Sequence, residues 1–287
     1  VNILVNFMTL ILGAHGMLGT AFKTTLEGHG LNFKAFGKED LDITNRDSVF
    51  SVINRSDNLC INCAAYTKVD LSETESESAF KVNEIGARNI AEACAKHGVA
   101  LIHFSTDYVF DGGKKTGYKE GDIPRPLSVY GESKLAGEKA VAYAMGGAPY
   151  YVVRTSWLYG PNGKNFVATI TRLLNEKPEL KVVNDQFGSP TYTMDLALAV
   201  LQNFIFPREL LASGIYHLTN SGTTTWYEFA KEIATLKKSE TPVIPIATED
   251  YPLPAKRPQH STLINTKLPK LRDWKAGLEH FLEKYPV

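Results

Sequence analysis

The stretch Leu10–Phe22, LILGAHGMLGTAF, decides the fold class, because it joins an apolar run to a glycine-rich turn and then to helix-compatible sequence. Its glycines, Gly13, Gly16 and Gly19, are spaced three apart. Between a strand and a helix, such glycines allow a tight turn, close approach of the backbone to a pyrophosphate, and close helix–strand packing. The N–H groups at the start of the helix then favour phosphate. The stretch predicts a dinucleotide-binding loop, with a purely structural turn as the alternative.

Strand-like and helix-like segments alternate on both sides of this loop. Strands are expected at 9–12, 32–36, 59–63, 100–104, 150–154, 180–183 and 215–218. Helices are expected at 17–27, 46–54, 79–97, 132–143, 165–175, 194–204, 226–236 and 274–284. This order predicts an α/β fold in which a doubly wound parallel Rossmann sheet is covered by helices on both faces.

The sequence pattern changes after Arg154, where short elements alternate with loops rich in Gly, Pro and Asn. Residues 242–258 are rich in proline. We therefore expect a smaller C-terminal substrate-binding domain. The division predicted is a Rossmann domain at 1–160, to which 193–220 returns, and a substrate-binding domain at 161–192 and 221–287.

The overall charge gives no indication of a polyanionic partner. Among the 287 residues, 31 are Lys or Arg and 31 are Asp or Glu. We expect neither nucleic acid nor a membrane as partner, since no apolar run reaches the roughly 18 residues that span a bilayer. The apolar start of the chain runs directly into the glycine loop and is interpreted as a first strand rather than a signal peptide.

The chain has three cysteines, Cys60, Cys63 and Cys94. This low, odd number argues against a disulfide framework and favours a reducing, cytoplasmic location. Cys60 and Cys63 have the CxxC spacing of redox and metal sites. However, residues three apart on a strand point to opposite faces, so a core role is favoured for both.

The end of the second expected strand should recognise the adenosine ribose. It reads FKAFGKEDLDI, residues 33–43, with Lys38 near the place where NAD-binding proteins carry an acid. A lysine there suits a 2′-phosphate and favours NADPH, while the neighbouring Glu39 and Asp40 leave NADH possible. His15, in the glycine loop, is interpreted as a lining residue rather than a catalyst.

The segment SVYGESKLAGEKA, residues 128–140, places Tyr130 and Lys134 four apart at the expected start of a helix. A free phenol has a pKa near ~10, and a cation one turn away is expected to lower it. Such a pair can exchange a proton with a carbonyl. HFSTDYVF, residues 103–110, follows a strand and offers the hydroxyls of Ser105 and Thr106 at the carboxyl edge of the sheet. A solvent-exposed surface pair is the alternative reading of the YxxxK spacing alone.

Together these motifs resemble the extended short-chain dehydrogenases/reductases, and within them the dTDP-4-dehydrorhamnose reductase family. The resemblance runs nearly end to end and is carried by GAHGMLG, NCAAYTKVD, STDYVFDG, YGESKLAGE, RTSWLYG, VVNDQFGSPT and AKRPQHS. It implies NADPH-dependent reduction of the C4 ketone of dTDP-4-dehydro-L-rhamnose, the last step of dTDP-L-rhamnose synthesis, by a cytoplasmic enzyme that feeds polysaccharide synthesis.

The resemblance also implies roles for individual residues. Thr106, Tyr130 and Lys134 match the catalytic residues. Cofactor-binding positions are matched by Gly13, His15, Gly16, Met17, Leu18, Gly19, Lys38, Asp42, Ile43, Ala64, Ala65, Tyr66 and Asn83, together with Tyr130 and Lys134. Substrate-binding positions are matched by Thr106, by Thr67, Val69, Tyr108 and Trp157 around the sugar, and by Asn165, Gln186 and Arg257 at the nucleotide end. Core packing is the alternative for Trp157, and helix hydrogen bonding for Asn83.

One departure concerns metal. Some relatives carry acids after the glycine loop that help bind magnesium at a dimer interface, whereas residues 20–25 read TAFKTT here. We therefore expect no metal and either a monomer or a homodimer.

Two rival functions remain. One is a nucleotide-sugar dehydratase or epimerase. Dehydratases of this superfamily carry Thr-Asp-Glu at the strand end, where the acids drive water elimination, whereas this chain has Thr106-Asp107-Tyr108, and the missing glutamate disfavours this function. A non-catalytic NADP-binding regulatory subunit shares the fold, and only turnover separates it from an enzyme.

Overall fold

The computed structural model describes residues 7–207 and 211–285 and is built around one parallel sheet. The order of its six strands is β11-β6-β4-β3-β1-β2, and every neighbouring pair is parallel. The strands are β1 (Met8–Leu12), β2 (Asn32–Phe36), β3 (Leu59–Asn62), β4 (Ala100–Thr106), β6 (Tyr150–Thr155) and β11 (Gly214–His217). The chain leaves β1 in opposite directions toward β2 and β3, which makes the β1/β3 boundary the topological switch point of the sheet.

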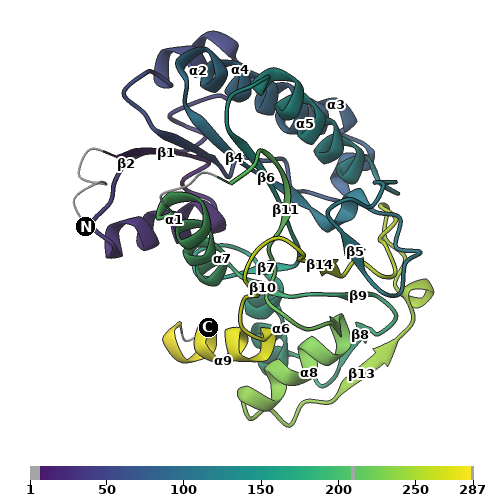
Figure 1. The fold of residues 1–287 in the computed structure, drawn as a ribbon. Coiled ribbons are helices and arrows are strands. Elements are labelled where there is room, and N and C mark those ends of the chain that lie inside the picture. The colour runs from purple at the N-terminus through teal and green to yellow at the C-terminus, as the bar shows by residue number, and fades with distance from the viewer. Residues whose placement is uncertain (1–6, 208–210, 286–287) are drawn as a thin grey trace.

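Helices cover both faces of this sheet (Figure 1). One face carries α2 (Arg46–Val52), α4 (Ala87–His97) and α5 (Val129–Met145). The other carries α1 (Met17–Gly28) and α7 (Thr193–Val200), which pack on each other. The expected fold class is confirmed.

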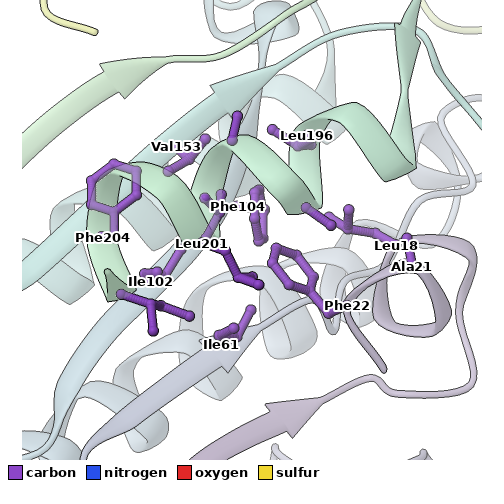
Figure 2. Packing of buried hydrophobic residues seen from close by; sticks show 14 of the residues in the cluster. Leu18, Ala21, Phe22, Ile61, Ile102, Phe104, Val153, Leu196, Leu201 and Phe204 are labelled. Atoms are coloured by element: carbon purple, nitrogen blue, oxygen red, sulfur yellow. The ribbon is translucent and has the colours of Figure 1, made fainter. Parts of the chain in front are cut away.

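The core under α1 and α7 follows the two-residue period of the strands. Ile61, Ile102 and Phe104 meet Phe22 from α1 and Leu201 from the end of α7, as Figure 2 shows. The rings of Phe22 and Phe104 lie 5.6 Å apart.

The cysteines obey the same alternation. Cys60 belongs to the core under α2, α4 and α5, whereas Cys63 packs against the core under α1 and α7. The two thiols therefore diverge, and the core role expected for them is confirmed.

A second lobe is formed by α6 (Phe166–Glu176), α8 (Trp226–Leu236) and α9 (Trp274–Lys284), with β8 (Leu180–Val183) pairing β13 (Val243–Ile246). Its core is largely aromatic and includes Tyr159, Tyr192, Phe229, Trp274 and Phe281. The sequence analysis assigned no strand or helix to the proline-rich residues 242–258, and β13 lies within them. Pro245 is tolerated because it lies in a two-stranded ribbon, where one edge of each strand is unpaired.

Other boundaries differ from expectation for local reasons. Helix α5 begins at Val129, not at 132, because the Ser128 side chain accepts a hydrogen bond from the N–H of Gly131 and caps the helix. The long helix expected at 79–97 is α3 (Ser76–Phe80), a π-helical segment η2 (Lys81–Gly86), and α4. A second π-helical segment, η4 (Leu201–Ile205), extends α7.

Several short elements carry too few residues to show any periodicity. They are η1 (Leu71–Glu73), η3 (Asp107–Val109), η5 (Thr248–Asp250), β5 (Tyr118–Lys119), β7 (Leu158–Tyr159), β9 (Phe187–Gly188), β10 (Thr191–Tyr192), β12 (Thr224–Thr225) and β14 (Leu263–Ile264). In the described part of the chain, no helix is long and apolar enough to span a bilayer.

Candidate active site

The glycine loop lies at the switch point and is built for close contact. Gly13 has φ +75°, and a Cβ placed there would lie 2.6 Å from the backbone nitrogen of Ala64 at the end of β3. A Cβ on Gly19 would lie 2.3 Å from the carbonyl oxygen of Gly13. Gly16 is the extended N-cap of α1, so the unpaired N–H groups of the first turn, starting at Met17 and Leu18, are available at this edge of the sheet. These features fit a pyrophosphate.

Charged and polar side chains gather at the end of β2. The His15 ring lies directly over Gly37, where a Cβ would come within 2.2 Å of its Nδ1, and this nitrogen is 3.5 Å from the Glu39 carboxylate. Lys38 is exposed and close enough to help lower the pKa of Asp42. His15 therefore packs against the end of β2, next to exposed Lys38.

Asp42 and Ile43 have mainly local partners. The Asp42 carboxylate accepts hydrogen bonds from the backbone and hydroxyl of Thr44, at 2.9 and 2.8 Å, and these bonds are the main cause of its lowered pKa. Ile43 is buried against Gly86.

The loop after β3 is tied to helix α5 by Asn83. Its amide oxygen accepts from the Tyr66 N–H at 2.9 Å, and its amide nitrogen donates to the Tyr66 carbonyl at 3.1 Å and to the Ser133 hydroxyl at 2.9 Å. Asn83 lies in the π-helical segment η2, a distortion often found at functional sites. It thereby fixes the backbone of Tyr66, two residues after Ala64, which lies against Gly13 of the glycine loop.

The three candidate catalytic residues come together at the carboxyl end of β4. Tyr130 is in the first turn of α5, Lys134 is one turn later, and Thr106 ends β4. The Thr106 hydroxyl hydrogen-bonds Tyr130, accepts from the N–H of Tyr108 at 3.2 Å, and donates to Asp107 at 3.0 Å. The Lys134 ammonium donates to the carbonyl of Phe104 at 2.7 Å.

The expectation that Lys134 makes Tyr130 acidic is wrong for this structure. Burial raises the pKa of Tyr130 to about 12, and it is the Thr106 hydrogen bond that opposes this rise. Burial lowers the pKa of Lys134 to about 8, because the nearby Glu138 carboxylate compensates only part of the desolvation. Tyr130 is thus a protonated phenol near neutral pH.

The residues expected around the sugar are only partly brought together. The ring of Tyr108 meets that of Tyr130 edge-on at 5.9 Å, and Val69 lies on the loop after β3 beside exposed Thr67. Trp157 has φ +47° and stacks on Trp226 with ring centroids 3.5 Å apart.

None of these residues lines a cavity of about 410 Å³ on the 111–125 loop. A second cavity, of about 580 Å³, opens beside Trp226 in the second lobe. The latter is lined by Leu127, Phe166, Thr169, Ile170, Leu173, Lys181, Val182, Val183, Gln186, Trp226, Thr248, Tyr251, Pro252, Leu253, Ala255, Lys256 and Arg257. Three of these lining side chains are cationic and none is acidic. The cavity therefore suits an anion with an apolar or aromatic part.

Two of the three residues expected at the nucleotide end line this cavity. Gln186 donates to Thr248 at 3.0 Å, and Arg257 forms a bidentate pair with Asp70 at 2.9 and 2.7 Å. Asn165 does not line it. Its amide oxygen instead caps α6. Its amide nitrogen donates to the Gly160 carbonyl at 3.0 Å and lies 3.8 Å from the sulfur of Met17 at the start of α1.

Four charged residues with roles at the site were missed. They are Asp70, Asp107, Glu138 and Arg154. Only Glu138 carried a sequence signal, because it extends the Tyr130–Lys134 spacing by a further four residues. Among the described residues, no group of three or more His, Cys, Asp or Glu side chains could hold a metal ion.

A doubly wound sheet, a glycine cradle at its switch point and a Thr-Tyr-Lys cluster at the next strand end define a Rossmann-fold oxidoreductase of the extended short-chain type. The chain belongs to the family described as RmlD substrate binding domain, whose model matches residues 7–287.

The chain is similar to several known proteins over almost its whole length. A dTDP-4-dehydrorhamnose reductase of Aggregatibacter actinomycetemcomitans is 41% identical, with 94% of this chain and 97% of the relative covered. The spore coat polysaccharide biosynthesis protein SpsK of Bacillus subtilis is 38% identical, with 96% of each covered. The crystal structure of a dTDP-4-dehydrorhamnose reductase from Bacillus anthracis in complex with NADP has a TM-score of 0.92 and 39% identity, covering 98% of this chain and 100% of that one.

Proposed function

We propose that this protein reduces the C4 ketone of dTDP-4-dehydro-L-rhamnose with NADPH, yielding dTDP-L-rhamnose. The observation that carries the proposal is the placing of Thr106, Tyr130 and Lys134 at one strand end beside the glycine cradle. The relatives named dTDP-4-dehydrorhamnose reductase, similar over almost their whole length, support it.

The residues of the glycine loop fit a dinucleotide. The start of α1 would hold the pyrophosphate, and exposed Lys38 would face the 2′-phosphate, in keeping with the NADP bound in the Bacillus anthracis relative. Asp42 and Ile43 remain proposed contacts of the adenine, and Ala64, Ala65, Tyr66 and Asn83 of the rest of the cofactor. When bound, NADPH supplies the hydride.

Tyr130 is proposed as the proton donor to the substrate oxygen. Since its pKa is about 12, the phenol is protonated near neutral pH, and it is still a stronger acid than the secondary alcohol being formed. Thr106 orients Tyr130 and the ketone oxygen. Lys134 would bind the ribose of the cofactor and place a positive charge near the oxygen that becomes negative.

The nucleotide end of the substrate is assigned to the cavity beside Trp226. Lys181, Lys256 and Arg257 offer positive charge to a diphosphate, and Trp226 and Gln186 offer an aromatic face and an amide to a base. The proposed contacts of the sugar are Thr67, Val69, Tyr108 and Trp157. For Asn165 we propose an indirect role, in which its contact with Met17 helps to hold the glycine loop in place. The two-domain division, the cytoplasmic location and a monomeric or homodimeric state also remain predictions.

Turnover separates this function from its rivals. NADPH oxidation should be measured with dTDP-4-dehydro-L-rhamnose and with a panel of other nucleotide 4-keto sugars. Oxidation fastest with the dTDP-linked ketone supports the proposal. Tight NADPH binding without consumption on any ketone identifies a regulatory subunit, and loss of water from a 4-hydroxy sugar identifies a dehydratase.

A further inference from the structure

Helix α5 presents a stripe of three functional groups toward the sheet. Tyr130, Lys134 and Glu138 are spaced four apart, so they lie on one face of the helix. Lys134 and Glu138 are only 3% and 4% exposed. Lys and Glu side chains are rarely fully buried, so a buried Glu138 carboxylate one helical turn after the buried Lys134 ammonium indicates a specific role.

The Glu138 carboxylate joins three elements. The Arg154 guanidinium, on β6, donates to both of its oxygens, at 2.8 and 2.6 Å, and Ser105, on β4, donates to it at 2.5 Å. Ser105 and Arg154 are register partners on adjacent strands. Ser105 also lies between Phe104, whose carbonyl accepts from Lys134, and Thr106. One carboxylate thus fixes α5 against the strand segment that carries Thr106.

The same carboxylate is the main negative charge facing Lys134. The other titratable groups around the ammonium are Cys63 from the end of β3, His103 from β4, and Tyr130. Burial raises the pKa of the Cys63 thiol and lowers that of His103, so both are neutral near neutral pH. Tyr130 is neutral as well.

We propose that Glu138, anchored by Arg154 and Ser105, is a positioning residue that keeps the Lys134 side chain charged and aligned with Tyr130 and Thr106. This inference rests on the proposed reductase function. A contribution to folding stability alone does not explain the buried Glu138–Arg154 ion pair, because proteins in which such a pair is replaced by apolar residues are often equally stable.

Titration of Lys134 tests the inference without substrate. The ε-amino group is followed by NMR in lysine-labelled protein, with the resonance assigned by its loss in Lys134→Met. In Glu138→Gln we expect the titration midpoint to fall by about one pH unit, as one charge a helical turn away implies. Glu138→Asp, which keeps the charge, should recover most of this shift.

The same variants are then assayed for turnover across pH. In Glu138→Gln the alkaline decline of kcat should move down by the same amount, with KM for the nucleotide sugar unchanged. Glu176→Gln, which removes the partner of Arg172 from an exposed pair on α6, serves as a matched control and should shift neither quantity. If Glu138→Gln does not fold, the double variant Glu138→Leu/Arg154→Met takes its place, and a smaller fall of the midpoint is expected because the positive charge of Arg154 is removed as well.

An unchanged Lys134 midpoint in a folded variant would overturn the inference. Failure of the proposed function would give a different result. The wild-type protein would then oxidise no NADPH with any ketone, while Glu138→Gln would still lower the titration midpoint of Lys134.

Discussion

Replacing Asp107 by Asn should remove a pH dependence of the folding stability that arises from the burial of this carboxyl. Asp107 is 2% exposed, and one of its carboxylate oxygens is buried without a hydrogen-bond partner. Burial therefore raises its pKa from 3.8 to about 6, although hydrogen bonds from Ser261 and Thr106 oppose the rise. A carboxyl whose pKa is raised in the folded state stabilises the fold below its unfolded pKa, and this contribution is lost as pH rises through the folded pKa.

The size of the effect follows from the shift. Two units correspond to about 3 kcal/mol of unfolding free energy, lost between about pH 4 and pH 6. The asparagine variant lacks this loss, so its stability relative to wild type should increase by about 3 kcal/mol over that interval and then stay constant.

Denaturant unfolding from pH 3.5 to 8 measures this difference, in which the contributions of all other groups cancel. Asp42→Asn is a control, because hydrogen bonds from Thr44 lower the pKa of Asp42 below 3.8, so its stability relative to wild type should stay constant above about pH 4. A difference between wild type and Asp107→Asn that does not vary with pH would refute the burial of an unpaired carboxyl beside Thr106.

Two further predictions concern ligand binding. Lys38→Ala should raise KM for NADPH about tenfold and leave KM for NADH unchanged, because only the 2′-phosphate distinguishes the cofactors; equal effects on both would show that Lys38 does not face that phosphate. Arg257→Ala should raise KM for the nucleotide sugar about 10- to 100-fold with little change in kcat, since it removes a charged hydrogen-bond donor from the cavity. Steady-state kinetics would contradict this assignment if kcat fell and KM did not.

The sequence predicted the features that depend on local spacing. The glycine loop and the alternation of strands and helices are periodic patterns, and they placed the central sheet correctly. The four-residue spacing of Tyr130 and Lys134 likewise predicted a shared helix face. The proline-rich 242–258 segment concealed β13, because proline disfavours strands except at edges.

What could not be predicted depends on contacts between distant residues. Asp70 forms an ion pair with Arg257, which lies 187 residues later in the sequence, and Glu138 on α5 forms one with Arg154 on β6. The pKa of Tyr130 depends on how deeply it is buried, and Lys134 turned out to donate to the Phe104 carbonyl. No spacing rule contains that information.

The central claim is that Tyr130 delivers the proton in a ketone reduction, and Tyr130→Phe tests it most directly. The variant keeps the ring that packs against Tyr108 and removes only the hydroxyl. We expect kcat to fall by about 10²- to 10⁴-fold while NADPH affinity stays unchanged. Turnover close to that of the wild type, in a variant that still binds NADPH, would contradict the claim.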